Sequence, residues 1–276
     1  MTILRGVLDS LWAAATRHPF LDAVREATIT DSAFDRWLVH DALFVGDLLT
    51  FQARLLARAP RPAQAVLGHG AAMTLSARLW ADNSDLAAAA LAHPFVSRLG
   101  DGSLPREIFA GYVAQDAFFL ESFARAYALA LARSTDTPTL LALADLLGGV
   151  REELGLHSSY AARWGIDMAG VVPTSATLAY TEFLLATAAT GGLALVFAAM
   201  TPCMRLYAWL GASLDASAAG PFAEWVQTYA DPSFQALAAR LEQLLDEQDD
   251  DNPAVHATYR RAMRLELNFF DAALAG

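Results

Sequence analysis

Apolar residues recur at three- and four-residue spacing along almost the whole chain. That spacing gathers side chains on one face of an α-helix, whereas a half-buried strand requires strict alternation. Alternating runs are absent from the sequence, and clusters of β-branched residues are few. The sequence therefore predicts an all-α protein, with helices at about residues 5–18, 31–58, 73–92, 105–133, 138–164, 174–190, 193–214, 221–230, 232–247 and 254–274.

Local signals mark the ends of several of these helices. Leu104-Pro105 places a proline in the first turn of one helix, and Asp231-Pro232 opens another. The acidic run at residues 247–253 is interpreted as a solvated loop before the last helix.

Composition limits the classes of function. Apolar residues make up 55% of the chain, which suffices for a large core and excludes global disorder. The formal net charge is −11, and every basic residue is an arginine. Because nucleic-acid binding depends on clustered positive charge, the acidic balance argues against such a partner. Cys203 is the single cysteine, so a disulfide within the chain is excluded.

The N-terminus lacks the long apolar stretch and cleavage-like site of a signal peptide, so we expect a cytoplasmic protein. Residues 183–200 carry no charge and are about long enough to be a transmembrane candidate. Gly191-Gly192 interrupts this stretch, and Glu182 and Arg205 flank it closely. We therefore expect a buried pair of helices and no membrane partner.

An internal repeat divides the chain. His18-Pro19-Phe20 recurs as His93-Pro94-Phe95, and the similarity continues without a gap until residue 58 meets residue 133. We interpret residues 1–60 as a partial copy of the opening of the downstream domain, residues 61–72 as a linker, and residues 73–276 as the main domain. The copy has an apolar face without a complete core, so it must pack on the main domain or on another chain.

Two acidic side chains fall on apolar helical stripes. Asp116 lies on the stripe that contains Phe109 and Tyr112, and Glu266 lies in the middle of a stripe in the last helix. Burial of a carboxylate is costly unless a group donates to it, and it tends to raise the pKa into the range that suits proton transfer. A structural acid held by a tyrosine or an arginine is the alternative interpretation of Asp116.

Cys203 follows Thr201-Pro202. A proline must begin a helix or kink one. If a helix restarts there, Thr201 is the N-cap and the positive end of the helix dipole favours a Cys203 thiolate. Tyr207 would lie one turn further on the same face. An inert small core residue is the alternative interpretation of a lone cysteine.

These elements resemble the TenA/thiaminase II family in order and spacing over nearly all of residues 73–276. The segments that carry the resemblance are FAGYVAQDAFFLESFARAYALAL, REELGLHSSYAARWGI, PTSATLAYTEFL, TPCMRLYAWLG, FAEWVQTYADPSF and RLELNFFDAAL. The resemblance implies a heme-oxygenase-like multihelical bundle, preceded here by an extra N-terminal helical segment. It also implies a homo-oligomer (a tetramer or a dimer) with no cofactor and no metal.

The resemblance implies hydrolysis of a thiamin-derived aminopyrimidine, 4-amino-5-aminomethyl-2-methylpyrimidine, to the hydroxymethylpyrimidine with release of ammonia. Thiamin itself could react by the same route. The implied catalytic residues are Cys203 as nucleophile, Glu266 as acid/base and Asp116 as a positioning acid. The implied pyrimidine-binding residues are Phe119, Tyr180, Tyr207 and Tyr229. Phe119 stands where the family usually has a tyrosine, so stacking is retained and one hydroxyl is lost.

Two other functions stay open at this point. A metal-dependent oxidase on the same bundle would use Glu153, His157 and Glu182, although di-iron bundles require more carboxylates and a Glu-x-x-His spacing. A hydrogen bond between helices is the simpler role for His157. The second alternative is a non-catalytic pyrimidine-binding or regulatory protein.

Overall fold

The computed structural model describes residues 18–26, 28, 30, 32, 73–166, 170–248 and 250–275. The chain divides into two compact units, Met1–Ala72 and Met73–Gly276. The helices expected at residues 5–18 and 31–58 lie almost wholly outside the described residues, as does the packing of the partial copy.

The repeated His-Pro-Phe element begins a helix in each unit. In the first unit α2 spans Pro19–Arg25, and in the second α7 spans Pro94–Gly100. His93 is the N-cap of α7, and its ring Nδ1 accepts a hydrogen bond from the Phe95 backbone N–H at 3.1 Å. Proline at the first position of α7 suits the helix start, since that position needs no N–H donor. Neither helix was predicted from periodicity, because each has only seven residues.

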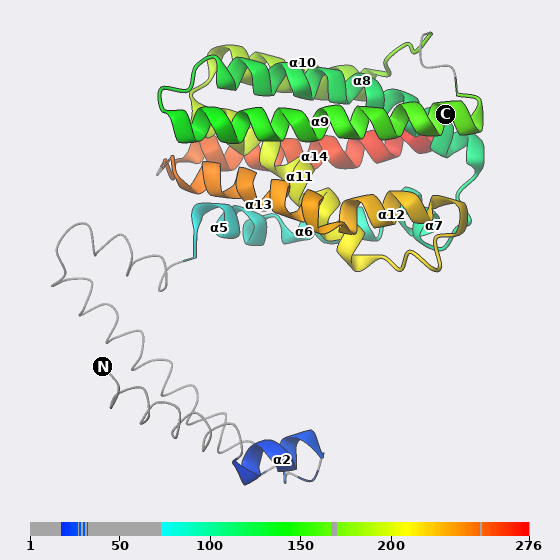
Figure 1. The fold of residues 1–276 in the computed structure, drawn as a ribbon, viewed down its shortest axis with the longest axis vertical. Helices are drawn as coiled ribbons and strands as arrows, with labels where there is room; N and C mark the ends of the chain where they lie inside the picture. The colour runs from blue at the N-terminus through cyan, green and yellow to red at the C-terminus, as the bar shows by residue number, and fades with distance from the viewer. Residues whose placement is uncertain are drawn as a thin grey trace, which may run out of the picture. The chain divides into compact units, whose positions relative to one another are not determined.

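All of the regular secondary structure among the described residues of the second unit is helical, as Figure 1 shows. This confirms the predicted all-α class. Its elements are α5 (Leu75–Asp82), α6 (Ser84–Leu91), α7, α8 (Arg106–Leu131), α9 (Thr137–Trp164), α10 (Ser175–Thr190), α11 (Leu193–Ser213), the 3-10 helix η1 (Gly220–Phe222), α12 (Ala223–Ala230), α13 (Pro232–Asp246) and α14 (Pro253–Ala275).

The helix α11 lies at the centre of this unit and packs against α12, α13 and α14 (Figure 1). The helices α8, α9 and α10 form a neighbouring group in which α8 contacts both of the others. The short helices α5, α6 and α7 pack against α13 and α14. The core therefore lies between α8, α10, α11 and α14, and these helices carry most of the predicted site residues.

The apolar stretch that resembled a membrane span is a pair of helices, as expected. The helix α10 ends at Thr190, and α11 begins after the Gly191-Gly192 break. Arg133 donates to the carbonyls of Ala188 and Gly191 and so satisfies the open end of α10. Among the described helices, α11 alone is long and apolar enough to cross a membrane, and 72% of that window is buried inside the protein.

The helix expected at residues 73–92 is wrong as a single element. Asn83 ends α5 and begins α6. Its side-chain amide donates to the Leu79 carbonyl at 2.7 Å, and its oxygen accepts from Arg260 at 3.0 Å. The nearly buried asparagine thus competes with the helical hydrogen bonds and turns the chain, a role for which Asn is suited.

Candidate active site

The structure gathers all of the predicted site residues around α11. They come from α8 (Asp116, Phe119), α10 (Tyr180), α11 (Cys203, Tyr207), α12 (Tyr229) and α14 (Glu266). Every one is buried except Cys203, which is partly accessible. Inward-facing positions on separate helices thus converge on one region of the bundle.

The thiol of Cys203 is paired with a carboxyl group. The carboxyl group of Glu266 lies close enough to the Cys203 thiol to raise its pKa, and it accepts a hydrogen bond from the Tyr180 hydroxyl at 2.6 Å. Burial and the charge of Asp116 together raise the pKa of Glu266 to about 8, against the opposing hydrogen bond from Tyr180. A carboxyl group with this pKa exchanges protons readily near neutral pH.

Of the two possibilities for Pro202, no helix begins at Thr201, and one helix runs through the proline as the predicted range 193–214 has it. Pro202 lies inside α11, and the Thr201 hydroxyl donates to the Phe197 carbonyl at 2.7 Å, one turn back. The positive end of the α11 dipole is therefore far from Cys203. Burial raises the pKa of the Cys203 thiol well above its usual value, and the nearby carboxylates, Glu266 first, raise it further. A thiolate at this site therefore requires a proton acceptor, and the nearby carboxyl group of Glu266 is a candidate for that role.

Asp116 pairs with a histidine, not with the tyrosine or arginine considered from the sequence. The Nε2 atom of His157 lies 2.7 Å from Asp116 Oδ2, and Nδ1 lies 2.8 Å from the Glu153 carbonyl oxygen. Both ring nitrogens therefore face acceptors, an arrangement that favours a doubly protonated ring. Burial lowers the pKa of His157, but the hydrogen bond and charge of Asp116 outweigh it and raise the pKa to about 9. The predicted hydrogen bond of His157 between helices is confirmed.

Glu153 also belongs to this cluster. Its carboxylate accepts a hydrogen bond from the Tyr229 hydroxyl at 2.6 Å. Burial and the charge of Asp116 raise the pKa of Glu153 to about 7, against the opposing charge of His157. The sequence suggested Glu153 only as a metal ligand. Among the described residues no group of three or more His, Cys, Asp or Glu side chains is placed to hold a metal ion.

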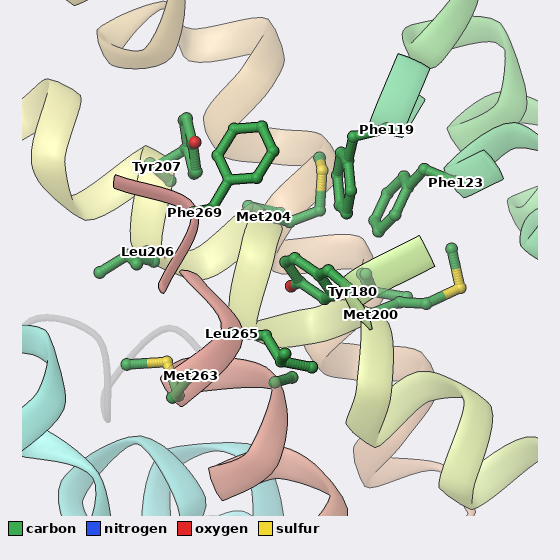
Figure 2. Packing of buried hydrophobic residues seen from close by; sticks show 14 of the residues in the cluster. Phe119, Phe123, Tyr180, Met200, Met204, Leu206, Tyr207, Met263, Leu265 and Phe269 are labelled. Carbon is green, nitrogen blue, oxygen red and sulfur yellow. The ribbon is translucent and has the colours of Figure 1, made fainter. Parts of the chain in front are cut away.

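Aromatic rings from several helices lie in the region of the candidate site. Figure 2 shows Phe119, Tyr180 and Phe269 converging on the core, with ring centroids 4.7 Å apart for Phe119 and Tyr180 and 6.0 Å for Phe119 and Phe269. On the other side Tyr207 and Tyr229 meet edge to face at 4.9 Å. Rings in these arrangements suit a flat heteroaromatic ligand. Phe269 was not recognised from the sequence, because only the facing helices distinguish it from an ordinary core residue.

A close approach of two helices fixes the position of Tyr229. A Cβ atom at Gly211 would lie 2.5 Å from the Tyr229 carbonyl carbon and 2.6 Å from the Ala230 backbone nitrogen. Only glycine allows α11 and α12 to come this close. The short contact places the Tyr229 ring against Tyr207, four residues before Gly211 on α11.

The chemical capacity of this arrangement follows from its parts. A thiol beside a carboxyl group is a pair that can provide a nucleophile and an acceptor for its proton. Asp116 and Glu153 place further carboxylates in the same region, and carboxylates suit the binding of amino groups and protonated ring nitrogens.

The model of the TENA/THI-4/PQQC family matches residues 80–276, which is most of the chain.

The chain belongs to this family. The resemblance inferred from the sequence motifs is therefore confirmed. Among its relatives, an aminopyrimidine aminohydrolase from Halalkalibacterium halodurans is 33% identical, over 73% of this chain and 96% of that protein. The mitochondrial bifunctional TH2 protein of Arabidopsis thaliana is 36% identical over 72% of this chain, and the match spans 37% of the plant protein's length.

Solved structures agree with this assignment. A TenA family transcription regulator from Silicibacter superposes with a TM-score of 0.68 at 30% identity, covering 72% of this chain and 95% of that one. A Shewanella denitrificans domain described as having a heme oxygenase-like fold gives a TM-score of 0.54 at 17% identity, over 72% of this chain and 91% of that one. The predicted heme-oxygenase-like bundle is thereby confirmed for the second unit.

Proposed function

We propose that this protein is an aminopyrimidine aminohydrolase of thiamin salvage. It converts 4-amino-5-aminomethyl-2-methylpyrimidine and water into the hydroxymethylpyrimidine and ammonia. The observation that carries the proposal is the buried carboxyl group of Glu266, which is held by the Tyr180 hydroxyl and lies close to Cys203 among aromatic rings. Relatives named for this reaction at 26% to 33% identity support it.

In the first step Glu266 takes the thiol proton, and the Cys203 thiolate forms a bond to the pyrimidine ring. The addition interrupts the aromatic ring and weakens the bond from the exocyclic methylene to the amine nitrogen. Glu266 returns its proton to that nitrogen as the C–N bond breaks, so that ammonia leaves with the bonding pair.

In the second step water adds to the exocyclic methylene, the ring-to-sulfur electron pair returns to Cys203, and one proton goes back to the sulfur through Glu266. The ring regains its aromaticity and the hydroxymethyl product is released. Asp116 positions the pyrimidine through its amino group or ring nitrogen, while Phe119, Tyr180, Tyr207 and Tyr229 hold the ring.

Ammonia release from the aminomethylpyrimidine by the full 276-residue chain, beside Cys203→Ser, tests the proposal. We expect turnover in the parent and none in the variant, with an unchanged circular dichroism spectrum. Turnover that persists in Cys203→Ser contradicts the nucleophile. Ligand binding without turnover in the parent would indicate the alternative, a pyrimidine-binding or regulatory protein.

The proposal also covers the localisation, oligomeric state and cofactor requirement of the protein. We expect a cytoplasmic homo-oligomer, a tetramer or a dimer, that acts without a cofactor. Light scattering on the full chain measures the oligomeric state.

A further inference from the structure

The side chain of Gln115 forms hydrogen bonds that the proposed mechanism does not use. Gln115 precedes Asp116 on α8, and its amide Nε2 donates to the Val172 carbonyl at 3.0 Å. Its Oε1 accepts two hydrogen bonds, from the Thr174 backbone N–H at 2.9 Å and from the Thr177 hydroxyl at 2.6 Å. These partners fix the orientation of the amide, because the opposite orientation would place its NH2 group against the Thr174 N–H. One side chain of α8 therefore holds three groups at or just before the start of α10.

The contacts of Gln115 fix the N-terminus of α10. Thr174 is the N-cap of this helix, and its hydroxyl accepts a hydrogen bond from the Thr177 N–H at 3.2 Å. The Thr174 N–H is one of the four N–H groups that a helix leaves without an intrahelical acceptor, and Gln115 supplies the acceptor. Thr177 is fully buried at the same place. Removal of the Gln115 carboxamide would take away the partner from α8 of both groups, and such a loss is costly in a protein interior.

These hydrogen bonds set the position of α10 along α8 more sharply than apolar packing does. The two helices are neighbours (Figure 1), and they also meet where the ring centroids of Phe119 and Tyr180 lie 4.7 Å apart. Phe119 is one turn after Gln115 on α8, and Tyr180 is three residues after Thr177 on α10, so the two contacts lie along the same facing stripes. Ring contacts persist over centroid separations of about 4.5–7 Å, whereas an O–H···O bond requires about 2.5–3.0 Å. The Gln115 contact is therefore the more exacting of the two.

The position of α10 decides whether Tyr180 reaches Glu266. The Tyr180 hydroxyl donates to Glu266 Oε1 at 2.6 Å, and both side chains are buried. The hydroxyl lies at the end of a rigid ring, so it moves with the helix that carries it. A slide of α10 by one residue would move the hydroxyl by about 1.5 Å, which is enough to break this hydrogen bond. Gln115 is thus connected to Glu266 through the helix that carries Tyr180.

We propose that Gln115 is a positioning residue of the reaction, whose carboxamide fixes the start of α10 so that the Tyr180 hydroxyl meets Glu266. The catalytic meaning of this inference rests on the proposed aminopyrimidine hydrolase function, but the geometry can be tested without turnover. Asp116 of α8 and Cys203 of α11 also act on Glu266, and neither is carried by α10. A displaced α10 should therefore raise the pKa of Glu266, because the hydrogen bond from Tyr180 lowers it.

The pKa of Glu266 in Gln115→Met tests the inference. Methionine is similar in length to glutamine, but it lacks the amide donor and the strong acceptor. The pKa is measured on the full 276-residue chain by NMR titration of isotope-labelled glutamate carboxyl groups, and the Glu266 resonance is identified by its absence in Glu266→Gln. We expect the pKa to rise from about 8 by at least about half a pH unit in Gln115→Met and in Thr177→Val. In a Tyr180→Phe background the same substitutions should cause no further rise.

Two further threonine variants separate positioning from a general loss of packing. Thr177→Ser keeps the hydroxyl that donates to Gln115, so the pKa of Glu266 should stay at the parent value. Thr181 is also buried on α10, but its hydroxyl donates to the Leu178 carbonyl of the same helix at 3.1 Å. Thr181→Val is a substitution of the same kind that breaks no contact with α8, so it should leave the pKa of Glu266 unchanged.

An unchanged pKa of Glu266 in Gln115→Met and Thr177→Val would overturn the inference. An equal rise in Thr181→Val would also overturn it, as would an undiminished rise in the Tyr180→Phe background. Ammonia release reports separately on the proposed function. If the parent releases ammonia, the midpoint of its kcat/KM profile should move with the pKa of Glu266 in Gln115→Met. If no ammonia is released, the proposed function fails, while the pKa comparison still decides whether Gln115 positions the Tyr180 hydroxyl.

Discussion

The pKa of Glu266 gives the proposed mechanism its pH dependence. Catalysis needs Glu266 ionised so that it can take the thiol proton, and its pKa is raised to about 8. Below that pH the ionised fraction falls about tenfold per pH unit, so kcat/KM at pH 6 should be about one tenth of its value at pH 7. A stopped ammonia assay over a working range of about pH 5.5 to 9.5 measures the rise of kcat/KM with pH and the midpoint of that rise.

Tyr180→Phe tests the origin of that midpoint. The Tyr180 hydroxyl donates to Glu266 and lowers its pKa, in opposition to burial. A hydrogen bond to a charged group contributes about 1.5–3 kcal/mol, so its loss should move the midpoint about one to two pH units upward. Glu266→Gln keeps the shape of the side chain but should lower kcat by about 100-fold or more and abolish the rise.

Glu242 provides a matched control, because it is another largely buried glutamate with a raised pKa. Glu242 on α13 has a pKa raised by burial, and it pairs with Arg205 at 3.6 Å. Glu242→Gln should leave the midpoint of the profile in place. If the midpoint of the kcat/KM profile is unchanged in Tyr180→Phe, or moves to lower pH, then Glu266 is not the proton acceptor and the proposed pH dependence is refuted.

Three further predictions concern the fold around the site. Asp116→Asn should lower the pKa of His157, which NMR titration measures. The same substitution should reduce the free energy of unfolding in urea by about 3 kcal/mol, because it removes the partner of a buried cation. A loss of stability below about 1 kcal/mol would contradict a tight ion pair. Gly211→Ala should cost about 1–3 kcal/mol and displace Tyr229, seen as a change in near-ultraviolet circular dichroism, and an unaffected spectrum would argue against the close contact. The raised pKa of Glu266 contributes stability that is fully present below pH 4.5 and is lost as the pH rises to about 8. The urea midpoint should therefore fall over that pH range, and it should fall less in Glu266→Gln. Equal changes of the urea midpoint with pH in the two proteins would contradict the assignment.

Local sequence signals predicted helix ends well where nothing else competed with them. Asp231-Pro232 begins α13, and the Asp231 side chain accepts a hydrogen bond from the Ser233 N–H at 2.8 Å. Thr201-Pro202 is the same kind of signal, yet it lies inside α11. Residues on both sides of it are buried, from Val196 to Leu206, apart from Cys203 and Arg205. Packing of one continuous helix thus outweighs the hydrogen bond that the proline removes.

Periodicity predicted which side chains point inward but not which of them meet. Asp116 and His157 are each identifiable as inward-facing positions on separate helices. Their contact depends on how far α8 is shifted along α9, which the sequence of neither helix specifies. The same holds for Glu153 and Tyr229, which meet only because α12 approaches α11 at Gly211. The family motifs suggested Asp116 and Tyr229 as site residues, whereas the sequence did not identify their hydrogen-bond partners.

The single cysteine is a natural chemical probe for motions of the protein interior. Cys203 is the only thiol in the chain, and its raised pKa makes it slow to react with an alkylating reagent in the closed bundle. The rate of labelling therefore reports how often the partly accessible thiol becomes more exposed and ionised, much as hydrogen exchange reports on a backbone amide. Labelling that a pyrimidine ligand suppresses would report a local opening at the site, whereas labelling that accelerates steeply with urea would report opening of the whole fold.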